Sequence, residues 1–152
     1  MAELNSKNYQ AQYINKPADK IRQGEVSGIK RTIYDSFVVP AGGIAAADKI
    51  LSLFLPEGAL VLDAKIKMPN LGATGILDLG HEGNAVEADD QNAFVDQADA
   101  GGQAVLERAD QDSADIYTRF SADTQVSVTC TELVPVGAAG SLIEWEVEYL
   151  IN

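Results

Sequence analysis

Several kinds of residue are scarce in this chain of 152 residues, and each scarcity argues against a class of protein. The only cysteine is Cys130, so an intramolecular disulfide is impossible. The only histidine is His81, so any catalytic or metal site built on histidine has to use that residue. No apolar run reaches the roughly 18 residues that span a bilayer, which argues against a membrane protein. Only 11 basic residues face 23 acidic ones, and this net charge of -12 disfavours nucleic acid as a partner.

Catalytic and metal-binding patterns are also missing. His81 lies in a glycine-flanked stretch just past a predicted strand end, with no nucleophile motif nearby, so we expect a surface loop histidine. Cys130 falls on the apolar face of its predicted strand, which predicts a buried, inert thiol. Residues 110–115 begin like a calcium loop but have Ala114 at the fifth position and Asp115 at the sixth, so the pattern fails and a solvated acidic loop is expected. The sequence therefore predicts neither an enzyme nor a cofactor.

The first 27 residues differ from the remainder and are predicted to form an extended N-terminal arm. Residues 1–31 carry a net charge of +3, whereas residues 32–152 carry -15. Pro17 and Gly24 interrupt any long helix, and over the whole arm the apolar side chains follow no helical or strand period. This pattern suits a segment that lies across a neighbouring subunit or another protein. The expected contact residues are Tyr9, Tyr13, Ile14, Lys16, Lys20, Ile21 and Arg22.

Residues 28–152 are expected to form one domain, because alternation of apolar and polar residues dominates from Gly28 onward. Turns such as Pro56-Glu57-Gly58, where proline fixes φ and glycine accepts a positive φ, separate the strands. Residues 89–98 are the exception: Asp89 could cap a short helix whose apolar residues share one face. The predicted strands are 29–39, 50–55, 59–68, 76–79, 103–107, 116–120, 125–131 and 141–151.

The last strand has the clearest pattern. Ile143, Trp145, Val147, Tyr149 and Ile151 take one face and are expected to be buried together. A stripe of glutamates, at positions 144, 146 and 148, takes the other face. That stripe is expected either to face water or to receive lysines and arginines from the arm of a neighbour.

Eight short strands without intervening long helices predict an all-β, antiparallel, jelly-roll-like β-sandwich. In a jelly roll the first, third, sixth and eighth strands share one sheet. The strand at 59–68 and the last strand would then lie in the same sheet.

One stretch resembles a segment of small structural proteins of tailed bacteriophages. Residues 48–63, DKILSLFLPEGALVLD, are similar to the pattern D-x-I-x-L…L-P-x-G-A-x-V-L-D of that group. Residues 71–80 and the strands between Val126 and Tyr149 extend the resemblance over most of residues 28–152. It implies a capsid decoration, or cement, protein: a jelly-roll core that sits as a homotrimer on the capsid surface of the virion and contacts the major capsid protein. The group has no active-site residues to carry over.

Three other functions stay open from the residues alone. The first is a phage tail, knob or fibre component with the same fold, and the second is an enzyme, which the single histidine disfavours. The third is a carbohydrate-binding β-sandwich module, which needs exposed aromatic rings. Trp145 lies on the predicted core face, so only Tyr34, Tyr117 and the tyrosines of the arm are free for that role.

Overall fold

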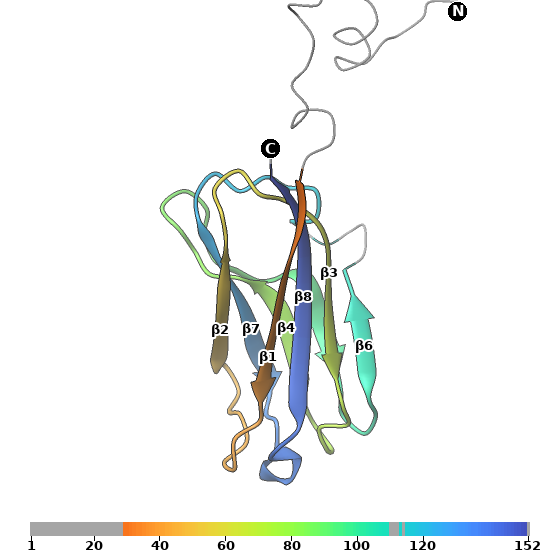
Figure 1. Cartoon of the computed structure of the whole chain (residues 1–152). Coiled ribbons are helices and arrows are strands. Elements are labelled where there is room, and N and C mark those ends of the chain that lie inside the picture. Colours follow the sequence, from red (N-terminus) through yellow and green to blue (C-terminus); the bar gives the residue numbers. More distant parts are fainter. Residues whose placement is uncertain (1–28, 110–112, 114, 152) are drawn as a thin grey trace, which may run out of the picture.

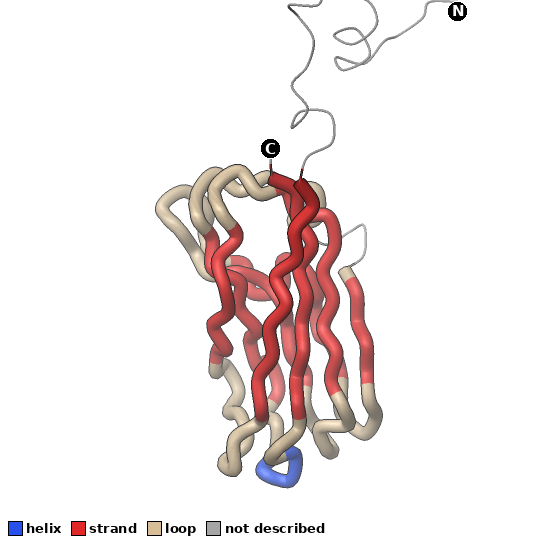
Figure 2. Tube along the Cα trace, in the orientation of Figure 1, coloured by secondary structure: helices blue, strands red, loops and turns tan. Residues whose placement is uncertain are grey.

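The computed structural model describes residues 29–109, 113 and 115–151. The arm, with all seven of its expected contact residues, lies outside the described residues, as does most of the calcium-like loop at 110–115. The described residues form a β-sandwich with one turn of 3-10 helix, η3 (Val136–Ala138), at the end opposite the first and last described residues (Figures 1 and 2). Its strands are β1 (Ile29–Val38), β2 (Lys49–Leu55), β3 (Leu60–Met68), β4 (Ile76–His81), β5 (Asp90–Asp99), β6 (Val105–Arg108), β7 (Thr124–Glu132) and β8 (Leu142–Ile151).

The strands form two antiparallel four-stranded sheets. One sheet has the order β1-β8-β3-β6 and the other has the order β2-β7-β4-β5. The chain passes from one sheet to the other after every strand except β4, whose neighbour β5 follows it in the same sheet. This is the jelly-roll arrangement, and it confirms the predicted fold class. β1 and β2 are therefore the edge strands on one side of the sandwich, and β6 and β5 are the edge strands on the other.

The period-2 pattern of β8 determines which side of its sheet is buried. Ile143, Trp145, Val147 and Tyr149 are 0–7% exposed, and Ile151 is partly buried against them, as the alternation predicted. β8 pairs with β1 on one side and β3 on the other, so it lies in the middle of its sheet. A one-residue slip of register would exchange these side chains with the glutamates, which explains why the register is well determined.

The helix expected over residues 89–98 is wrong, because this segment is strand β5. Its consecutive buried residues Ala93, Phe94 and Val95, followed by Ala98, mimic a helical face. The register between β4 and β5 shifts twice, and Gln97 has a φ of 52°, so bulges replace simple alternation.

The strand expected at 116–120 is also wrong. Residues 115–117 form turns, Tyr117 has a φ of 65°, and only an isolated bridge joins Arg119 to Leu60. The first, third, sixth and eighth strands do share a sheet, but the sixth is β6 and not residues 116–120.

Two glycines meet conformational demands that other residues could not. Gly58 has a φ of 82° in the turn before β3, as the Pro-Glu-Gly sequence predicted. Gly80 lies where β5 comes very close to β4, because a Cβ there would be 2.2 Å from the carbonyl oxygen of Asp90. The absence of a side chain at Gly80 therefore permits the close β4–β5 approach.

Candidate functional site

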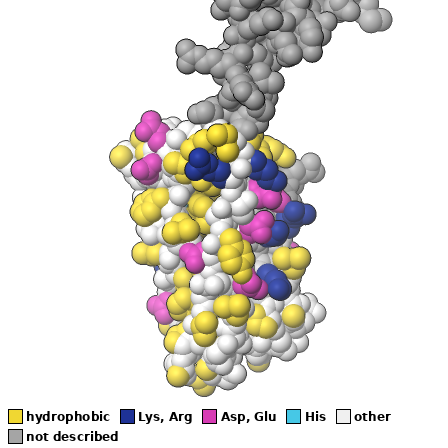
Figure 3. Space-filling model, in the orientation of Figure 1, with side chains coloured by type: hydrophobic (Ala, Val, Ile, Leu, Met, Phe, Trp, Pro, Cys, Tyr) yellow, Lys and Arg dark blue, Asp and Glu magenta, His cyan; other side chains and the backbone are white. Residues whose placement is uncertain are grey.

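The outer face of the β1-β8-β3-β6 sheet is charged, and its charges are paired within the chain. Each glutamate of the β8 stripe has a lysine of a neighbouring strand within 3.2 Å, and Asp63 of β3 has Arg108 of β6 at 2.7 Å. Figure 3 shows acidic and basic side chains interspersed on the right of the molecule. The lysine pairs are Lys67–Glu144 at 3.2 Å, Lys65–Glu146 at 3.0 Å and Lys30–Glu148 at 2.6 Å. The glutamate stripe is thus already neutralised by lysines of the same chain.

A tyrosine adds a directional contact to this charged face. The hydroxyl of Tyr34 donates a hydrogen bond to the carboxylate of Glu144, which also pairs with Lys67. The hydrogen bond from Tyr34, and then the one from Lys67, lowers the pKa of Glu144 below its ordinary value of 4.5. The same hydrogen bond raises the pKa of Tyr34 above 10.0, because ionisation would remove the donated proton. Tyr34 is therefore engaged with its own sheet face.

Strand β2 presents a different kind of surface, which we call the β2 apolar strip: Leu51, Leu53 and Phe54. Each of these side chains is more than half exposed. The register of β2 with β7 shifts between Leu51 and Phe54, so one extra residue is inserted on β2. In Figure 3 apolar side chains gather on the left of the molecule, the side on which β2 lies. Large apolar side chains exposed on an edge strand are typical of surfaces to which another chain binds.

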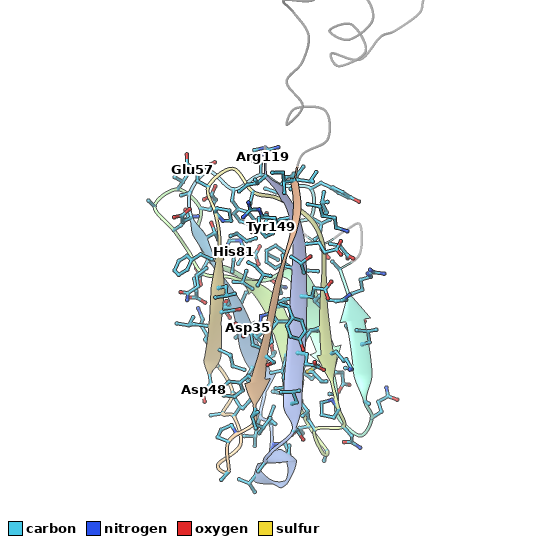
Figure 4. All side chains as sticks on the ribbon, viewed as in Figure 1. Asp35, Asp48, Glu57, His81, Arg119 and Tyr149 are labelled. Atoms are coloured by element: carbon cyan, nitrogen blue, oxygen red, sulfur yellow. The ribbon has the colours of Figure 1, made fainter. Side chains whose placement is uncertain are left out.

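A shallow cleft continues this surface at the start of β2. It has a volume of about 350 Å³ and opens between the end of β1 and the beginning of β2. Asp48 marks its place at the lower left of Figure 4. The side chain of Asp48 accepts a hydrogen bond from the backbone N–H of Ala45 at 3.0 Å, which orders the loop before β2. The cleft is lined by Phe37, Pro40, Gly43, Ile44, Asp48, Lys49, Ile50 and Leu51.

A chain of hydrogen bonds joins the two sheets behind the β2 apolar strip. The hydroxyl of Ser52 donates to Asp35 Oδ2 at 2.7 Å and accepts from Trp145 Nε1 at 3.1 Å. Ser52 belongs to β2, whereas Asp35 and Trp145 belong to β1 and β8 of the opposite sheet. Figure 4 shows Asp35 on the β1–β2 side of the sandwich. This chain holds the edge strand β2 against the other sheet, so the exposed strip sits on a fixed support.

The expectation of a surface loop histidine is wrong. His81 is the last residue of β4 and is 1% exposed, inside the upper part of the sandwich in Figure 4. Its Nε2 lies 2.8 Å from Asp115 Oδ2, and its Nδ1 lies 3.0 Å from the carbonyl oxygen of Glu82. Its ring also meets that of Phe120 edge-on at a centroid distance of 5.1 Å. Both ring nitrogens therefore serve to fix local structure and are out of reach of a substrate.

Three further features of the described residues bear on function: the reactivity of the cysteine, the grouping of possible metal ligands and the length of apolar helices. Cys130 is buried, as predicted, and desolvation raises the pKa of its thiol. Within residues 29–109, 113 and 115–151 there is no group of three or more His, Cys, Asp or Glu side chains that could hold a metal ion. No helix in that part of the chain is long and apolar enough to cross a membrane.

The sequence interpretation missed the β2 apolar strip. The sequence predicts a strand at 50–55, in which Ser52 is the single polar residue, but it does not show which of these side chains face outward. The lack of alternation was the available signal, because an outer strand of an antiparallel sandwich normally has a polar outer face.

Comparison with known proteins gives a fold but no family. No protein-family profile and no curated protein matches the sequence. Among solved structures, a chain of the capsid of Ralstonia phage GP4 superposes with a TM-score of 0.67 at 20% identity, covering 93% of this chain and 94% of that one.

Two further solved structures match over most of both chains. A chain of the Cyanophage Pam1 capsid asymmetric unit gives a TM-score of 0.57 at 21% identity, with 82% and 86% covered. A chain of the acid-stable capsid of Helicobacter pylori bacteriophage KHP30 gives 0.55 at 14% identity, with 81% and 88% covered. The fold of this chain is thus one that phage capsid structures contain, which confirms the resemblance to phage structural proteins.

Proposed function

We propose that this chain is a structural protein of a bacteriophage virion, and specifically a capsid decoration, or cement, protein on the outer surface of the head. The observation that carries the proposal is the match to the GP4 capsid chain over more than nine-tenths of both chains. Because the match covers 93% of this chain and 94% of that one, the two chains can be compared along most of their length. The three matched structures named above are all capsids, which favours a head component over a tail component.

The physical properties of the described residues suit this role. A decoration protein has to fold rigidly and hold its neighbours together through exposed surfaces. The sandwich supplies a core of fully buried residues, a charged sheet face that is internally paired, and an apolar strip on an edge strand. The strip is a surface on which another chain can bury apolar area. The natural partner under this proposal is the major capsid protein together with further copies of this chain.

The oligomer and the arm belong to the same proposal. The resemblance to cement proteins implies a homotrimer, and a three-fold ring needs two different complementary surfaces on each subunit. The arm of residues 1–27 would provide one of them, through Tyr9, Tyr13, Ile14, Lys16, Lys20, Ile21 and Arg22. An arm that reaches a second binding surface raises the overall affinity through effective concentration.

The carbohydrate-binding alternative has less support. Trp145, the only tryptophan of the chain, is 2% exposed and donates its indole N–H to Ser52, so it offers no stacking surface. Tyr34 is exposed but is hydrogen-bonded to Glu144. Tyr117, at 70% exposed, is the remaining aromatic platform on the described surface outside the β2 apolar strip.

The direct test is addition of the purified full-length protein to phage heads that lack it, followed by sedimentation and electron microscopy. We expect saturable binding at symmetric positions on the head and none on isolated tails. Binding to tails alone would reassign the protein to the tail. Binding to neither particle, together with retention on a glycan array, would favour the carbohydrate-binding module.

A further inference from the structure

The free edge of β2 is shaped to receive another extended strand. Among the described strands β2 pairs only with β7, so one row of its backbone N–H and C=O groups has no strand partner. The β2 apolar strip lies along this same strand. Backbone groups give affinity in strand addition, and exposed apolar side chains give selectivity for an apolar, alternating partner. A lone chain gains nothing from exposing such an edge, which invites uncontrolled pairing.

The arm contains one short segment with the matching pattern. Although the whole arm follows no period, Tyr9, Ala11 and Tyr13 alternate with Gln10 and Gln12. Tyrosine is favoured in strands, and the alternation would give this segment one aromatic face and one polar face. The run from Asn8 to Ile14 has seven residues, the same length as β2. The segment from Asn8 to Ile14 therefore has the length and the alternating side chains of a strand that could pair with the free edge of β2.

The chain between this segment and the sandwich is long enough to reach a neighbour. Residues 15–28 separate Ile14 from the start of β1, and fully extended they span about 50 Å. The ten-residue strand β1 is about 33 Å long. The segment can therefore travel beyond the end of its own sandwich and still pair along the full length of a neighbour's β2.

Complementary charge also favours contact between the arm of one copy and β2 of another. The segment is followed by Lys16, Lys20 and Arg22. The surroundings of β2 include Asp35 and Asp48, which lack lysine or arginine partners among the described residues. Complementary charges of this kind raise the rate of association more than the final affinity.

We propose that residues 8–14 of one copy add as a strand to the free edge of β2 in another copy, with the tyrosine face against the β2 apolar strip. The choice of another copy over the same copy rests on the proposed function, which requires several copies side by side. It also rests on the hydrogen bonds from Ser52 to Asp35 and from Trp145 to Ser52, which already hold β2 in its own sandwich without help from the arm. The edge is then a link between subunits.

The test is cross-linking between two differently tagged full-length copies that are co-expressed. One carries Leu53→Cys on β2, the other carries Ala11→Cys in the arm, and a short bismaleimide joins thiols that lie close together. Cys130 is buried and can stay. We expect a covalent heterodimer, with a yield roughly tenfold above that of a matched control in which Leu106→Cys, similarly exposed on β6 at the opposite edge of the sandwich, replaces Leu53→Cys.

Three outcomes would overturn the proposal. The first is an equal yield with Leu106→Cys, the second is no heterodimer, and the third is cross-linking only within one chain when both cysteines are in the same copy. A second pair of variants tests the backbone ladder: Gln12→Pro should lower the yield strongly, because proline has no N–H, whereas Gln12→Ala should not. The experiment uses no phage heads, so failure to bind heads would refute the decoration role while leaving this result intact.

Discussion

The outer face of the β1-β8-β3-β6 sheet and the β2 apolar strip are both exposed, yet they differ in what they leave unpaired. On the sheet face the three glutamates of β8 each have a lysine partner from a neighbouring strand. On the strip three large apolar side chains have no covering group within the described residues. The glutamates of the sheet face find their partners within one chain, whereas the apolar side chains of the strip are covered only when another chain binds. Charge, which is the prominent feature of the sequence, is therefore a poor guide to the binding surface here.

The two surfaces also differ in what they contribute to the free energies of folding and of association. Exposed ion pairs typically contribute about 0–1 kcal/mol each, because water and salt screen them. Their role on the sheet face is mainly to keep that face soluble and to oppose stacking of one sheet on another. Apolar side chains on an edge strand contribute nothing to the isolated chain and about 25 cal/mol for each Å² that a partner buries. The strip consequently matters for association and not for folding.

The largest effect we expect comes from removing the residue on which both surfaces depend. Trp145 fills the core beneath the charged face and donates a hydrogen bond to Ser52 behind the strip. Trp145→Ala should lower the free energy of unfolding by about 3–5 kcal/mol, measured by urea denaturation. Tyr117→Ala, which truncates an exposed aromatic ring, is the control and should change it by less than about 0.5 kcal/mol. Equal losses in both variants would contradict the assignment of Trp145 to the core.

The second prediction separates association from folding at the strip itself. Leu53→Asp should weaken self-association or head binding at least tenfold, about 1.4 kcal/mol, because a carboxylate would be desolvated in the interface. Its free energy of unfolding should change by less than about 0.5 kcal/mol, because the side chain is exposed. Sedimentation equilibrium and urea denaturation measure the two quantities. Leu106→Asp, on β6 at the opposite edge of the sandwich, is the matched exposed control, and an identical loss of association in that variant would remove the strip from the interface.

The sequence predicted the sheet in which alternation is regular and failed where bulges or distant contacts intervene. β8 alternates cleanly, so its bounds and its buried face could be predicted. The bounds of β3 could be predicted too, but its alternation holds only from Ala64 to Met68, because a register shift against β8 between Val61 and Asp63 buries Val61 and leaves Leu60 and Leu62 partly exposed. β5 could not be, because its two register shifts against β4 bury Ala93, Phe94 and Val95 in succession. A bulge depends on the partner strand, and the local sequence does not contain that partner.

The candidate site was harder to predict for the same reason. His81 was expected at the surface because glycines flank it, but its burial depends on Phe120 and Asp115, which lie 39 and 34 residues further along the chain. The apolar run around Leu53 was visible, yet its exposure follows from β2 being an edge strand, which is a property of the topology. What the sequence did contain was a run in which Ser52 is the single polar residue, so that no polar side chain alternates with Leu51, Leu53 and Phe54 on an outer face.

The third prediction concerns the support beneath the strip. Asp35→Ala removes the acceptor for the Ser52 hydroxyl and should lower the free energy of unfolding by about 1–2 kcal/mol. Asp35→Asn keeps an acceptor oxygen at that position and should cost clearly less. The two variants are compared by urea denaturation, with hydrogen exchange of the β1 and β2 amides as a local measurement. Equal effects of both substitutions would mean that the carboxylate charge, and not the hydrogen bond, is what matters at this edge.

The smallest effect is expected on the charged face, where pairing is internal and exposed. The pKa of Glu144 is lowered below 4.5 in the folded protein, chiefly by the hydrogen bond from Tyr34. A carboxyl group whose folded pKa is depressed adds stability above its unfolded pKa, and this contribution is lost as the pH falls through the folded pKa. Tyr34→Phe should therefore raise the pKa of Glu144 toward 4.5 and flatten the pH dependence of stability in that acidic range.

A carbon-detected NMR titration of the Glu144 carboxyl group measures this shift directly, and Tyr117→Phe is the control because that tyrosine is not bonded to Glu144. The raised pKa of Tyr34 provides an independent check at alkaline pH, since its contribution is complete below 10.0 and is lost as the pH rises through the folded value. Glu144→Gln should bring the pKa of Tyr34 back toward 10.0. If Glu144 titrates identically in wild type and Tyr34→Phe, the Tyr34–Glu144 hydrogen bond is absent in solution. Tyr34 would then be free to bind a partner. In that case β1 would belong with the β2 apolar strip as a surface available for binding, and not with the internally paired sheet face.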